Sequence, residues 1–428
     1  MIPKEKLIKA AEFLATHIKA DDFTINASYA DKLDSRFAQN GITQHIKGAR
    51  YNVFLNVAFG RKTGSASVND LDESALLKLI KKAETMAELN QPDPEFVASE
   101  GSHTIPVVNN FSLETAELPL ERVVDGIEKC VANAISKAAK VSGISTLEFG
   151  GHYLLTKNGF SGWDQFTTFS HSMTMKKEGI ETKVSGSVKD FASFDMDRMI
   201  QQLNTQFDAL SKPEPFETGR IPVILRPAAV LDWIQYMFWM YQQRMADDGM
   251  TPYSGQNGKQ FFGEKFTLRS TIEDPELATS AFNGAGIPAE NLNWIKNGII
   301  ENMQVGRDYA KVKGIKPTFS CNFVMDGGTA TEEEMMQMVD RGIIINRLWY
   351  IRPIDQKKGE MTGLTRDGVL YFENGKVQKS VTNFRWNEIM YDISNRILAM
   401  GPTVLQESYA KVPTILVDGF NFVDVTTF

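Results

Sequence analysis

Four arginines and one tyrosine near the C-terminus have the side-chain types best suited to gripping a ligand. They are Arg347, Tyr350, Arg352, Arg366 and Arg385. All lie among residues with strand-like patterns rather than on a helical surface. A guanidinium presents a planar fork of donors, so arginines on strands can line a cleft that holds carboxylates or peptide carbonyls. The alternative is that they are charges at strand ends or internal ion pairs with Asp355 and Asp367.

The segment that must position these side chains, residues 342–388, has the pattern of a β-meander. Apolar and β-branched runs occupy residues 343–351, 368–372 and 377–381, and turn signals stand at Asp367-Gly368 and Asn374-Gly375. Asn-Gly is the stronger signal, because both residues tolerate the positive φ of a two-residue turn. We therefore predict a hairpin that pairs residues 369–373 with 376–381.

The usual catalytic signatures are absent from the sequence. It contains no G-x-x-x-x-G-K-[ST] phosphate loop, no G-x-S-x-G elbow, no C-x-x-C pair, and neither H-E-x-x-H nor H-E-x-x-x-H. The last of the five histidines is His171, which excludes histidine chemistry from the C-terminal half. We interpret Gly327-Gly328 as a turn and Asp247-Asp248 as solvated acids.

Composition narrows the class of protein further. The net charge of −7 over 428 residues, with scattered lysine and arginine, gives no electrostatic footprint for nucleic acid. No apolar run approaches the roughly 20 residues of a membrane span, and residues 1–20 form an amphipathic rather than a secretory pattern. Cys130 and Cys321 are expected to be buried thiols rather than a disulfide. These features predict a cytoplasmic protein that binds neither nucleic acid nor membrane.

The N-terminal half, residues 1–212, is predicted to be an α+β domain. Expected helices cover residues 3–20, 71–90, 119–139 and 196–211, and expected antiparallel strands cover 22–30, 33–39, 42–47, 51–61, 144–149, 152–157, 164–176 and 181–192. Residues 22–90 and 144–211 share their order of Asn-Gly turn, long strand, glycine turn, Ser-rich strand and helix, which indicates an internal repeat. The Ser-rich strands suggest either a hydroxyl-lined cleft or solvent-facing edges, and we favour the second.

The C-terminal half, residues 213–428, is predicted to be a barrel-like mixed β domain with few helices, so that the whole chain is α+β. Expected strands cover residues 221–225, 297–305, 317–325 and 414–422, and expected helices cover 228–245, 331–340 and 386–400. The helix over 228–245 is apolar in nearly every direction and should be buried on most sides. Residues 247–287 read as a long irregular loop system.

Four segments together resemble one known family. They are SRFAQNGITQ (35–44), GRKTGSASVNDLDESALLKLIKKAETMA (60–87), GLTRDGVLYFENGKV (363–377) and VTNFRWNEIMYDISNRILAMG (381–401). The chain resembles, over its whole length, the TldD/PmbA (TldE) family, which is also called modulator of DNA gyrase and peptidase U62. The resemblance implies a two-domain subunit of a peptide-processing metallopeptidase assembly with an enclosed cavity.

The resemblance also locates a departure from the catalytic members. In TldD-type proteins the helix that enters the C-terminal domain carries an H-E-x-x-x-H zinc motif, and a later cysteine completes the site. Here the corresponding helix, residues 228–245, offers only Asp232, and no cysteine follows Cys321. Zinc needs three His, Cys or carboxylate ligands. The chain is therefore similar to the TldE/PmbA type, with no catalytic or metal-binding residue and no cofactor of its own.

Three functional hypotheses follow. The first is a non-catalytic subunit, a pseudoenzyme that pairs with a zinc-containing TldD-like metallopeptidase, helps to hold extended peptide and forms a homodimer when alone. Arg347, Tyr350, Arg352, Arg366 and Arg385 would then line the cavity. The alternatives are an autonomous peptidase with an unrecognised carboxylate or serine site, and a scaffold protein without a peptide path.

Overall fold

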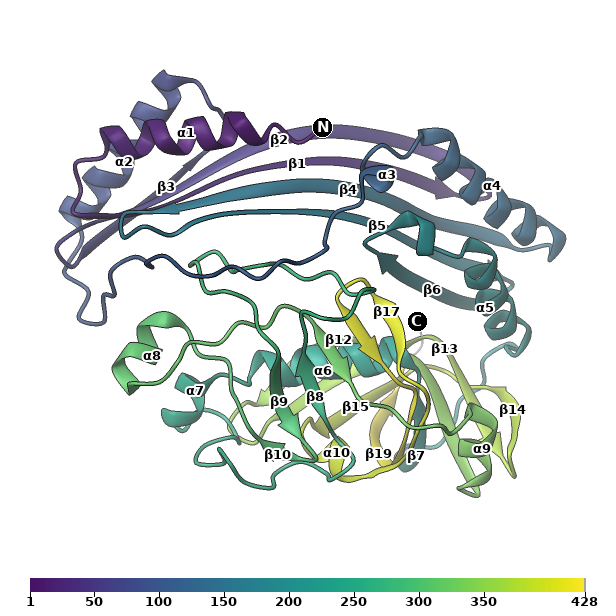
Figure 1. Cartoon of the computed structure of the whole chain (residues 1–428). Coiled ribbons are helices and arrows are strands. Elements are labelled where there is room, and N and C mark those ends of the chain that lie inside the picture. The colour runs from purple at the N-terminus through teal and green to yellow at the C-terminus, as the bar shows by residue number, and fades with distance from the viewer. Residues whose placement is uncertain (427–428) are drawn as a thin grey trace.

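A curved sheet of six long antiparallel strands forms the N-terminal half of this computed structural model, which describes residues 1–426 (Figure 1). The strand order is β3-β2-β1-β4-β5-β6. The strands are β1 (Asp22–Ala38), β2 (Gly41–Phe59), β3 (Lys62–Val68), β4 (Lys140–Thr156), β5 (Ser161–Lys177) and β6 (Ile180–Val188). The predicted order of antiparallel strands is confirmed.

The predicted strand lengths were wrong in this sheet. Residues 22–30 and 33–39 are one strand, β1, and residues 42–47 and 51–61 belong to another, β2. Gly48, which separates two of the predicted strands, makes no turn and pairs with Lys32 inside the ladder. The turn at Asn40-Gly41 does exist, because Gln39 and Asn40 adopt φ of 52° and 64° and close a two-residue hairpin.

Helices cover only the convex face of this sheet, in two groups (Figure 1). One group is α1 (Lys4–His17) and α2 (Glu73–Leu89), and the other is α4 (Leu120–Ser136) and α5 (Met196–Asp208). The five apolar residues that recur at helical spacing in α2 are all buried: Leu76, Leu79, Ile80, Ala83 and Ala87. In α4, Cys130 and Ala134 lie on the buried face, whereas the apolar Ile135 is 60% exposed.

The order of elements is the same in both parts of the N-terminal half. A helix, three strands and a helix occur as α1-β1-β2-β3-α2 and again as α4-β4-β5-β6-α5. The two sets meet where β1 pairs with β4 at the centre of the sheet. Residues 90–112 and the short helix α3 (Leu113–Ala116) connect them.

A closed barrel lies at the centre of the C-terminal half. Its strands are β7 (Gly219–Leu225), β12 (Arg341–Asp355), β13 (Glu360–Glu373), β15 (Phe384–Ile389) and β19 (Ile415–Val425). The pairings run β12-β7-β19-β15-β13, and β13 returns to β12. Only β7 and β12 are parallel. The barrel-like mixed sheet predicted for this half is therefore confirmed.

Smaller elements surround the barrel. They are β14 (Lys376–Ser380), β16 (Ile397–Met400), the sheet of β8 (Leu268–Ser270), β9 (Leu292–Lys296), β10 (Ile299–Ile300), β11 (Phe323–Met325), β17 (Val404–Glu407) and β18 (Ala410–Val412), and the helices α6 (Pro227–Trp239), α7 (Gln243–Asp247), α8 (Arg307–Lys313), α9 (Glu332–Gln337) and α10 (Asp392–Asn395). Helix α6 is buried along most of its surface, as its apolar sequence predicts. A capping box of Thr331 and Glu334 begins α9.

Several local predictions in this half were wrong. Residues 386–400 form the end of β15, the short α10 and β16 instead of one helix. The expected strand over 297–305 is reduced to the two residues of β10, which pair with β9 just before them. The pair Asp367-Gly368 makes no turn: both have positive φ, of 65° and 95°, and form a bulge inside β13, while the chain turns at residues 356–359.

The Ser-rich strand β6 is an edge strand of the sheet, but it does not face solvent as we favoured. The Ser187 hydroxyl donates to Glu407 at 2.6 Å and accepts from the Ser408 backbone N–H at 2.7 Å, and Thr182 donates to the Asp367 carbonyl at 3.0 Å. The hydroxyls of β6 therefore join the two halves of the chain.

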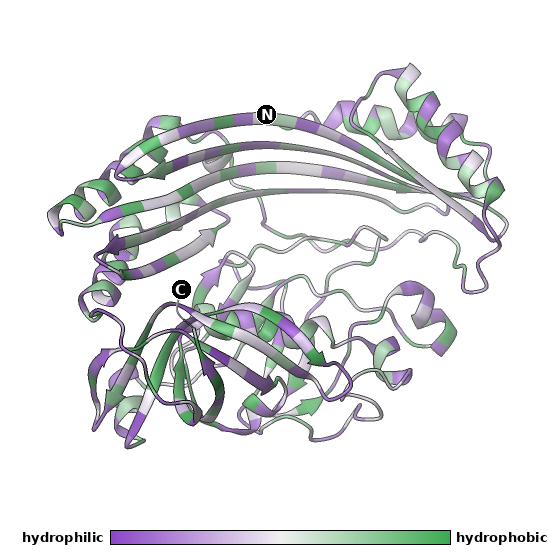
Figure 2. Cartoon of the chain, turned by 180° about the vertical axis from the view of Figure 1, so that it is seen from behind, coloured by the Kyte–Doolittle hydropathy of each residue, from purple (hydrophilic) through white to green (hydrophobic). Residues whose placement is uncertain are grey.

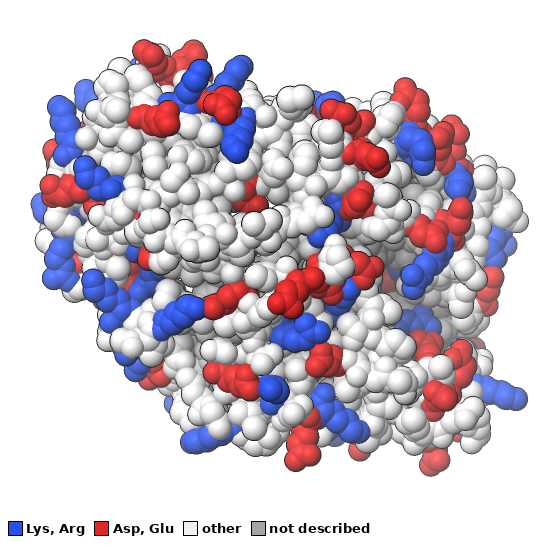
Figure 3. Space-filling view, in the orientation of Figure 1, with Lys and Arg blue, Asp and Glu red and all other residues white. Residues whose placement is uncertain are grey.

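Along the long strands, hydrophilic and hydrophobic residues alternate (Figure 2). On the face shown in Figure 3, basic and acidic side chains are interspersed rather than gathered into a block of one sign. Within residues 1–426, no helix is long and apolar enough to cross a membrane.

Both thiols are free, with Cys130 buried as predicted and Cys321 only partly buried. Burial raises the pKa of Cys130 to about 12 and that of Cys321 to about 11. The thiolate is the reactive form, so we expect both cysteines of the folded protein to react slowly with a disulfide reagent at pH 8. Titration before and after unfolding checks this; rapid modification of Cys130 in the folded protein would contradict it.

Candidate functional site

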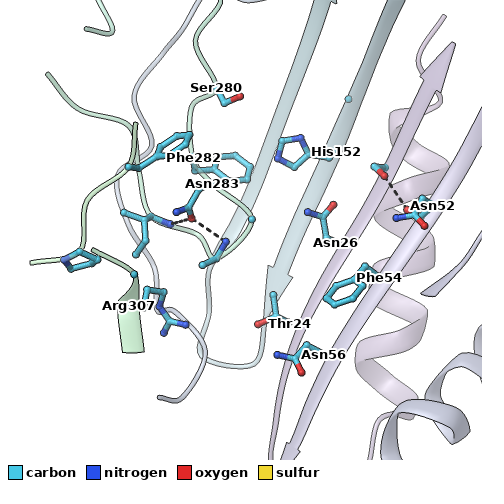
Figure 4. A pocket seen from close by; sticks show the side chains of 18 of the residues that line it. Thr24, Asn26, Asn52, Phe54, Asn56, His152, Ser280, Phe282, Asn283 and Arg307 are labelled. Carbon is cyan, nitrogen blue, oxygen red and sulfur yellow. Dashed lines mark hydrogen bonds between the residues drawn. The ribbon is translucent and has the colours of Figure 1, made fainter. Parts of the chain in front are cut away.

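A cleft of about 1220 Å³ lies between the concave face of the N-terminal sheet and loops of the C-terminal half. Its floor comes from β1, β2 and β4, and its opposite wall from residues 280–287, 305–308 and 317–319. Figure 4 shows these two sides facing each other across the space. The cleft therefore brings together segments more than 250 positions apart in the sequence.

Alternation along two strands makes the floor polar. Thr24, Asn26 and Ser28 of β1 point into the cleft, whereas the residues between them are buried under the helices. On β2 the same pattern places Asn52, Phe54 and Asn56 in the cleft, as Figure 4 shows. The register sets Asn52, Ser28 and His152 side by side across three strands. The floor is thus a row of amides and hydroxyls.

A braced loop forms part of the opposite wall. The Asn283 side-chain oxygen accepts from the backbone N–H groups of Ala285 and Ile287, both at 3.0 Å, as the dashed lines in Figure 4 mark. Phe282 of this loop stacks edge-on against His152, with ring centroids 5.0 Å apart. Contacts inside the loop and across the cleft therefore fix its shape.

An ion pair holds another part of the wall, the start of α8, against the irregular connection of residues 90–112. Arg307, at the start of α8, donates to Glu100 at 2.5 Å and to the Ala98 carbonyl at 2.5 Å. Glu100 also contacts His103 at 2.8 Å. The pKa of Glu100 is lowered because His103 and Arg307 outweigh the effect of its burial. The irregular residues 91–112 are thereby held against the C-terminal half.

His152 lines the cleft, and its cross-strand neighbour Asp164 is buried beside it. Burial lowers the pKa of His152 and raises the pKa of Asp164. The Asp164 carboxylate accepts the backbone N–H groups of Gln165 at 2.9 Å and Ala281 at 3.0 Å. These bonds make Asp164 a positioning residue for the wall loop rather than a free acid.

Neutral amides and hydroxyls predominate on the floor of the cleft, although Arg50 and Glu148 also line the floor and Arg307 and Asp308 line the wall. Amides and hydroxyls offer both donors and acceptors, which suits a polypeptide backbone without favouring a charged group. Within residues 1–426, no group of three or more His, Cys, Asp or Glu side chains is placed to hold a metal ion.

Helix α6 is the element that the family resemblance assigns to zinc, and its residues do not fit that ion. The Asp232 carboxylate accepts the Leu348 backbone N–H at 3.1 Å and pairs with Arg347 at 3.4 Å. Burial raises the pKa of Asp232 to about 6 although Arg347 opposes the rise. The space beside the Asp232 carboxylate is taken by the Arg347 guanidinium and the Leu348 N–H. Both are hydrogen-bond donors and cannot act as metal ligands.

None of the five predicted ligand-binding residues lines the large cleft. Arg347 is paired with Asp232, and Arg352 lies over the ring of Tyr350 at 4.5 Å. Arg385 lies on β15, in the row that also holds Leu364 of β13. Their contact with substrate stays a prediction.

Arg366 lies in a different place from the other arginines. It stacks on Trp349 at 4.2 Å and contacts Asp367 at 3.7 Å. Together with these two residues it lines a smaller cavity of about 370 Å³ between the halves. The expected ion pair with Asp367 is therefore present, whereas Asp355 contacts Lys358 instead of an arginine.

The cleft residues were missed at the sequence level, although a signal exists. The alternation of polar and apolar residues in 22–30 and 51–59 was used only to predict strands. A face of threonine, asparagine and serine opposite a fully apolar face is itself unusual, and it marks the floor of the cleft. Nothing in the sequence shows that the C-terminal loops cover that face.

Comparisons with known proteins agree with this architecture. A family model described as the PmbA/TldA metallopeptidase C-terminal domain matches residues 218–424. Metalloprotease PmbA of Escherichia coli O157:H7 is 20% identical over 386 residues, which covers 85% of this chain and 83% of that protein.

Solved structures are similar over nearly the whole chain. TldE from Thermococcus kodakarensis has a TM-score of 0.86 at 16% identity and covers 98% of this chain and 99% of its own. A Thermotoga maritima protein described as a modulator of a DNA gyrase has a TM-score of 0.85 at 15% identity, with coverage of 98% and 100%. Residues 218–424 thus match the C-terminal domain of the PmbA/TldA metallopeptidase family, and over most of its length the chain is similar to PmbA and shares the fold of TldE.

Proposed function

We propose that this chain is a non-catalytic, TldE-like subunit that pairs with a TldD-like zinc metallopeptidase and helps to hold extended peptides for cleavage. The observation that carries the proposal is the state of α6. Its one acidic side chain, Asp232, is committed to Arg347 and to the Leu348 N–H, and the helix has no histidine, cysteine or glutamate. Hydrolysis by bound zinc requires ligands that this helix does not offer.

The amide-lined cleft supports the second part of the proposal. An extended peptide exposes backbone donors and acceptors on both edges, and asparagine side chains such as Asn26, Asn52 and Asn56 can pair with either kind. Few charged groups line the floor, so binding would depend little on the peptide's sequence. The free thiols fit a reducing compartment, and we propose a cytoplasmic location on that ground.

The proposal is tested by the metal content and peptidase activity of the purified chain, alone and mixed with a TldD-like protein from the same genome. We expect less than about one-tenth equivalent of zinc in this chain, because α6 lacks zinc ligands. We expect cleavage of an unstructured peptide only in the mixture, because zinc supplies most of the rate of such hydrolysis. The TldD-like protein with its own zinc ligands replaced serves as the matched control and should leave the mixture inactive.

Three results would contradict the proposal. Stoichiometric zinc in this chain alone would mean that ligands lie outside α6. Cleavage by this chain alone, unaffected by chelators, would favour an autonomous peptidase. A chain that neither cleaves nor changes the activity of its partner would instead be a scaffold. Sedimentation of the chain alone would show whether it forms the expected homodimer.

A further inference from the structure

The first half of β2 is a long strand edge that no other part of residues 1–426 covers. Strand β3 pairs with β2 only from Val53 to Phe59, so residues 41–52 have a neighbour on one side alone, β1. Residues 42–50 are exposed without interruption, including the apolar Ile42 at 37% and Ile46 at 48%. Edges of this length normally pair with another strand or are covered.

The geometry of the β2–β3 hairpin and one side-chain hydrogen bond identify which backbone groups of β2 are free. Phe59 and Lys62 close the two-residue turn to β3, so the N–H and C=O of Phe59 point toward β3. The direction of the backbone N–H and C=O groups alternates from one residue to the next along a strand. The groups that point to the same side as those of Phe59 therefore include those of Val53, Tyr51, Ala49, Lys47 and His45. The Asn52 carbonyl points the other way, since it accepts the hydroxyl of Ser28 in β1 at 3.1 Å.

Outward-facing donors and acceptors therefore occur at His45, Lys47, Ala49 and Tyr51, beyond the end of β3. The open edge also reaches the cleft, because Arg50, Tyr51 and Asn52 line both. A strand added here would extend the six-stranded sheet directly beside the proposed peptide path.

The charge of the edge selects its partner. Residues 41–52 carry His45, Lys47 and Arg50 but no acidic side chain. The acids of the neighbouring strand are engaged, with Asp34 paired to Lys32 at 3.2 Å and Asp31 accepting from Tyr29 at 3.4 Å. A second copy of this chain would set like charges opposite one another, which disfavours pairing.

We propose that residues 42–52 of β2 are the docking edge for an acidic edge strand of the partner subunit, which pairs with the outward backbone groups of His45, Lys47, Ala49 and Tyr51. This inference rests on the proposed function for the existence of a partner. The shared sheet would join the two subunits beside the cleft.

A proline substitution tests the backbone pairing without disturbing the chain's own sheet. Ala49→Pro removes an outward N–H, which β1 does not use, and edge strands tolerate proline at such positions. Ala49→Ser keeps that N–H and is the matched control. We expect the Kd for the TldD-like protein to rise by about tenfold or more in Ala49→Pro, since a hydrogen bond is lost and the ring blocks the incoming strand, and to be unchanged in Ala49→Ser.

A charge reversal tests the chemistry of the partner strand. The double variant Lys47→Glu, Arg50→Glu keeps every backbone group, and we expect it to weaken the complex by about tenfold in low salt and less in high salt. Circular dichroism and thermal melting establish that the variants are folded.

The outcomes separate this inference from the proposed function. If the wild-type pair forms and cleaves peptide while Ala49→Pro binds equally well, the docking edge is wrong and the proposed function stands. If Ala49→Pro instead splits a homodimer of this chain and leaves the pair intact, the edge pairs with a second copy and the acidic partner is wrong. Absence of any complex with the wild type would overturn both.

Discussion

Replacing Arg347 with alanine is expected to destabilise the fold by about 3 kcal/mol at pH 8, because it leaves a buried carboxylate without its counter-charge. The carboxylate is Asp232 of α6, whose side chain is 17% exposed. Its remaining hydrogen bond is the Leu348 N–H at 3.1 Å. Urea unfolding of the wild type and the variant measures the difference.

The size of this effect depends on pH in a defined direction. Burial already holds the pKa of Asp232 at about 6, above the ordinary value near 4. Between these values the folded state binds a proton that the unfolded state has lost, so the fold loses stability as pH rises from about 4 to 6. Without Arg347 the pKa of Asp232 rises further. We therefore expect the variant to lose much less stability at pH 5, where Asp232 is protonated.

Asp232→Asn provides the matched control for this prediction. Asparagine keeps an acceptor for the Leu348 N–H and has no charge to compensate, so Arg347→Ala should cost little in its background at either pH. An equal loss at pH 5 and pH 8 would mean that Arg347 acts through packing of its side chain rather than through its charge.

The order of helices and strands in the N-terminal half could be predicted from the sequence, because helical spacing and turn residues depend only on neighbours in the chain. Helical spacing gave the buried face of α2, and Asn40-Gly41 marked a real hairpin. Strand lengths were underestimated because residues near Gly48 looked like a turn. Glycine inside a strand is read correctly only when the neighbouring strand is known, and Lys32 of β1 supplies that context.

The C-terminal misassignments have a physical cause in the closed barrel. Residues 384–389 alternate Phe384, Trp386 and Glu388 inward, a period of two that the following residues 390–400 obscured. Glu388 is buried because Arg396 donates to it at 2.5 Å and the Asn421 N–H at 2.7 Å. An acid at an inward position looks like a surface residue until such partners are placed beside it.

The candidate site was the part least accessible from sequence. Its floor and wall are joined by contacts such as that of His152 with Phe282, 130 positions apart. Of the arginines singled out from the sequence, Arg347, Arg352 and Arg366 instead contact neighbours within the C-terminal half. What sequence did supply was the absence of metal ligands on α6, which needs no tertiary information.

Filling the cleft beside His152 is expected to reduce peptide cleavage by the assembled pair about a hundredfold, as a loss of nearly 3 kcal/mol in transition-state binding would do. The change is Ser28→Trp. Ser28 lies on the floor between Asn52 and His152, and the ring of Phe282 stands 5.0 Å from that of His152 on the far side. An indole at this point occupies the space through which an extended peptide would pass.

Two matched variants separate blockage from other causes. Ser28→Ala removes the hydrogen bond to the Asn52 carbonyl without filling the cleft, and it should keep most of the activity. Arg36→Trp places the same indole on the same face of β1, eight residues or roughly 27 Å away, and should also be active. Cleavage is measured at saturating partner, with complex formation verified separately. Full activity of a correctly assembled Ser28→Trp pair would mean that peptides reach the zinc by another path, and the cleft would then lose its proposed role.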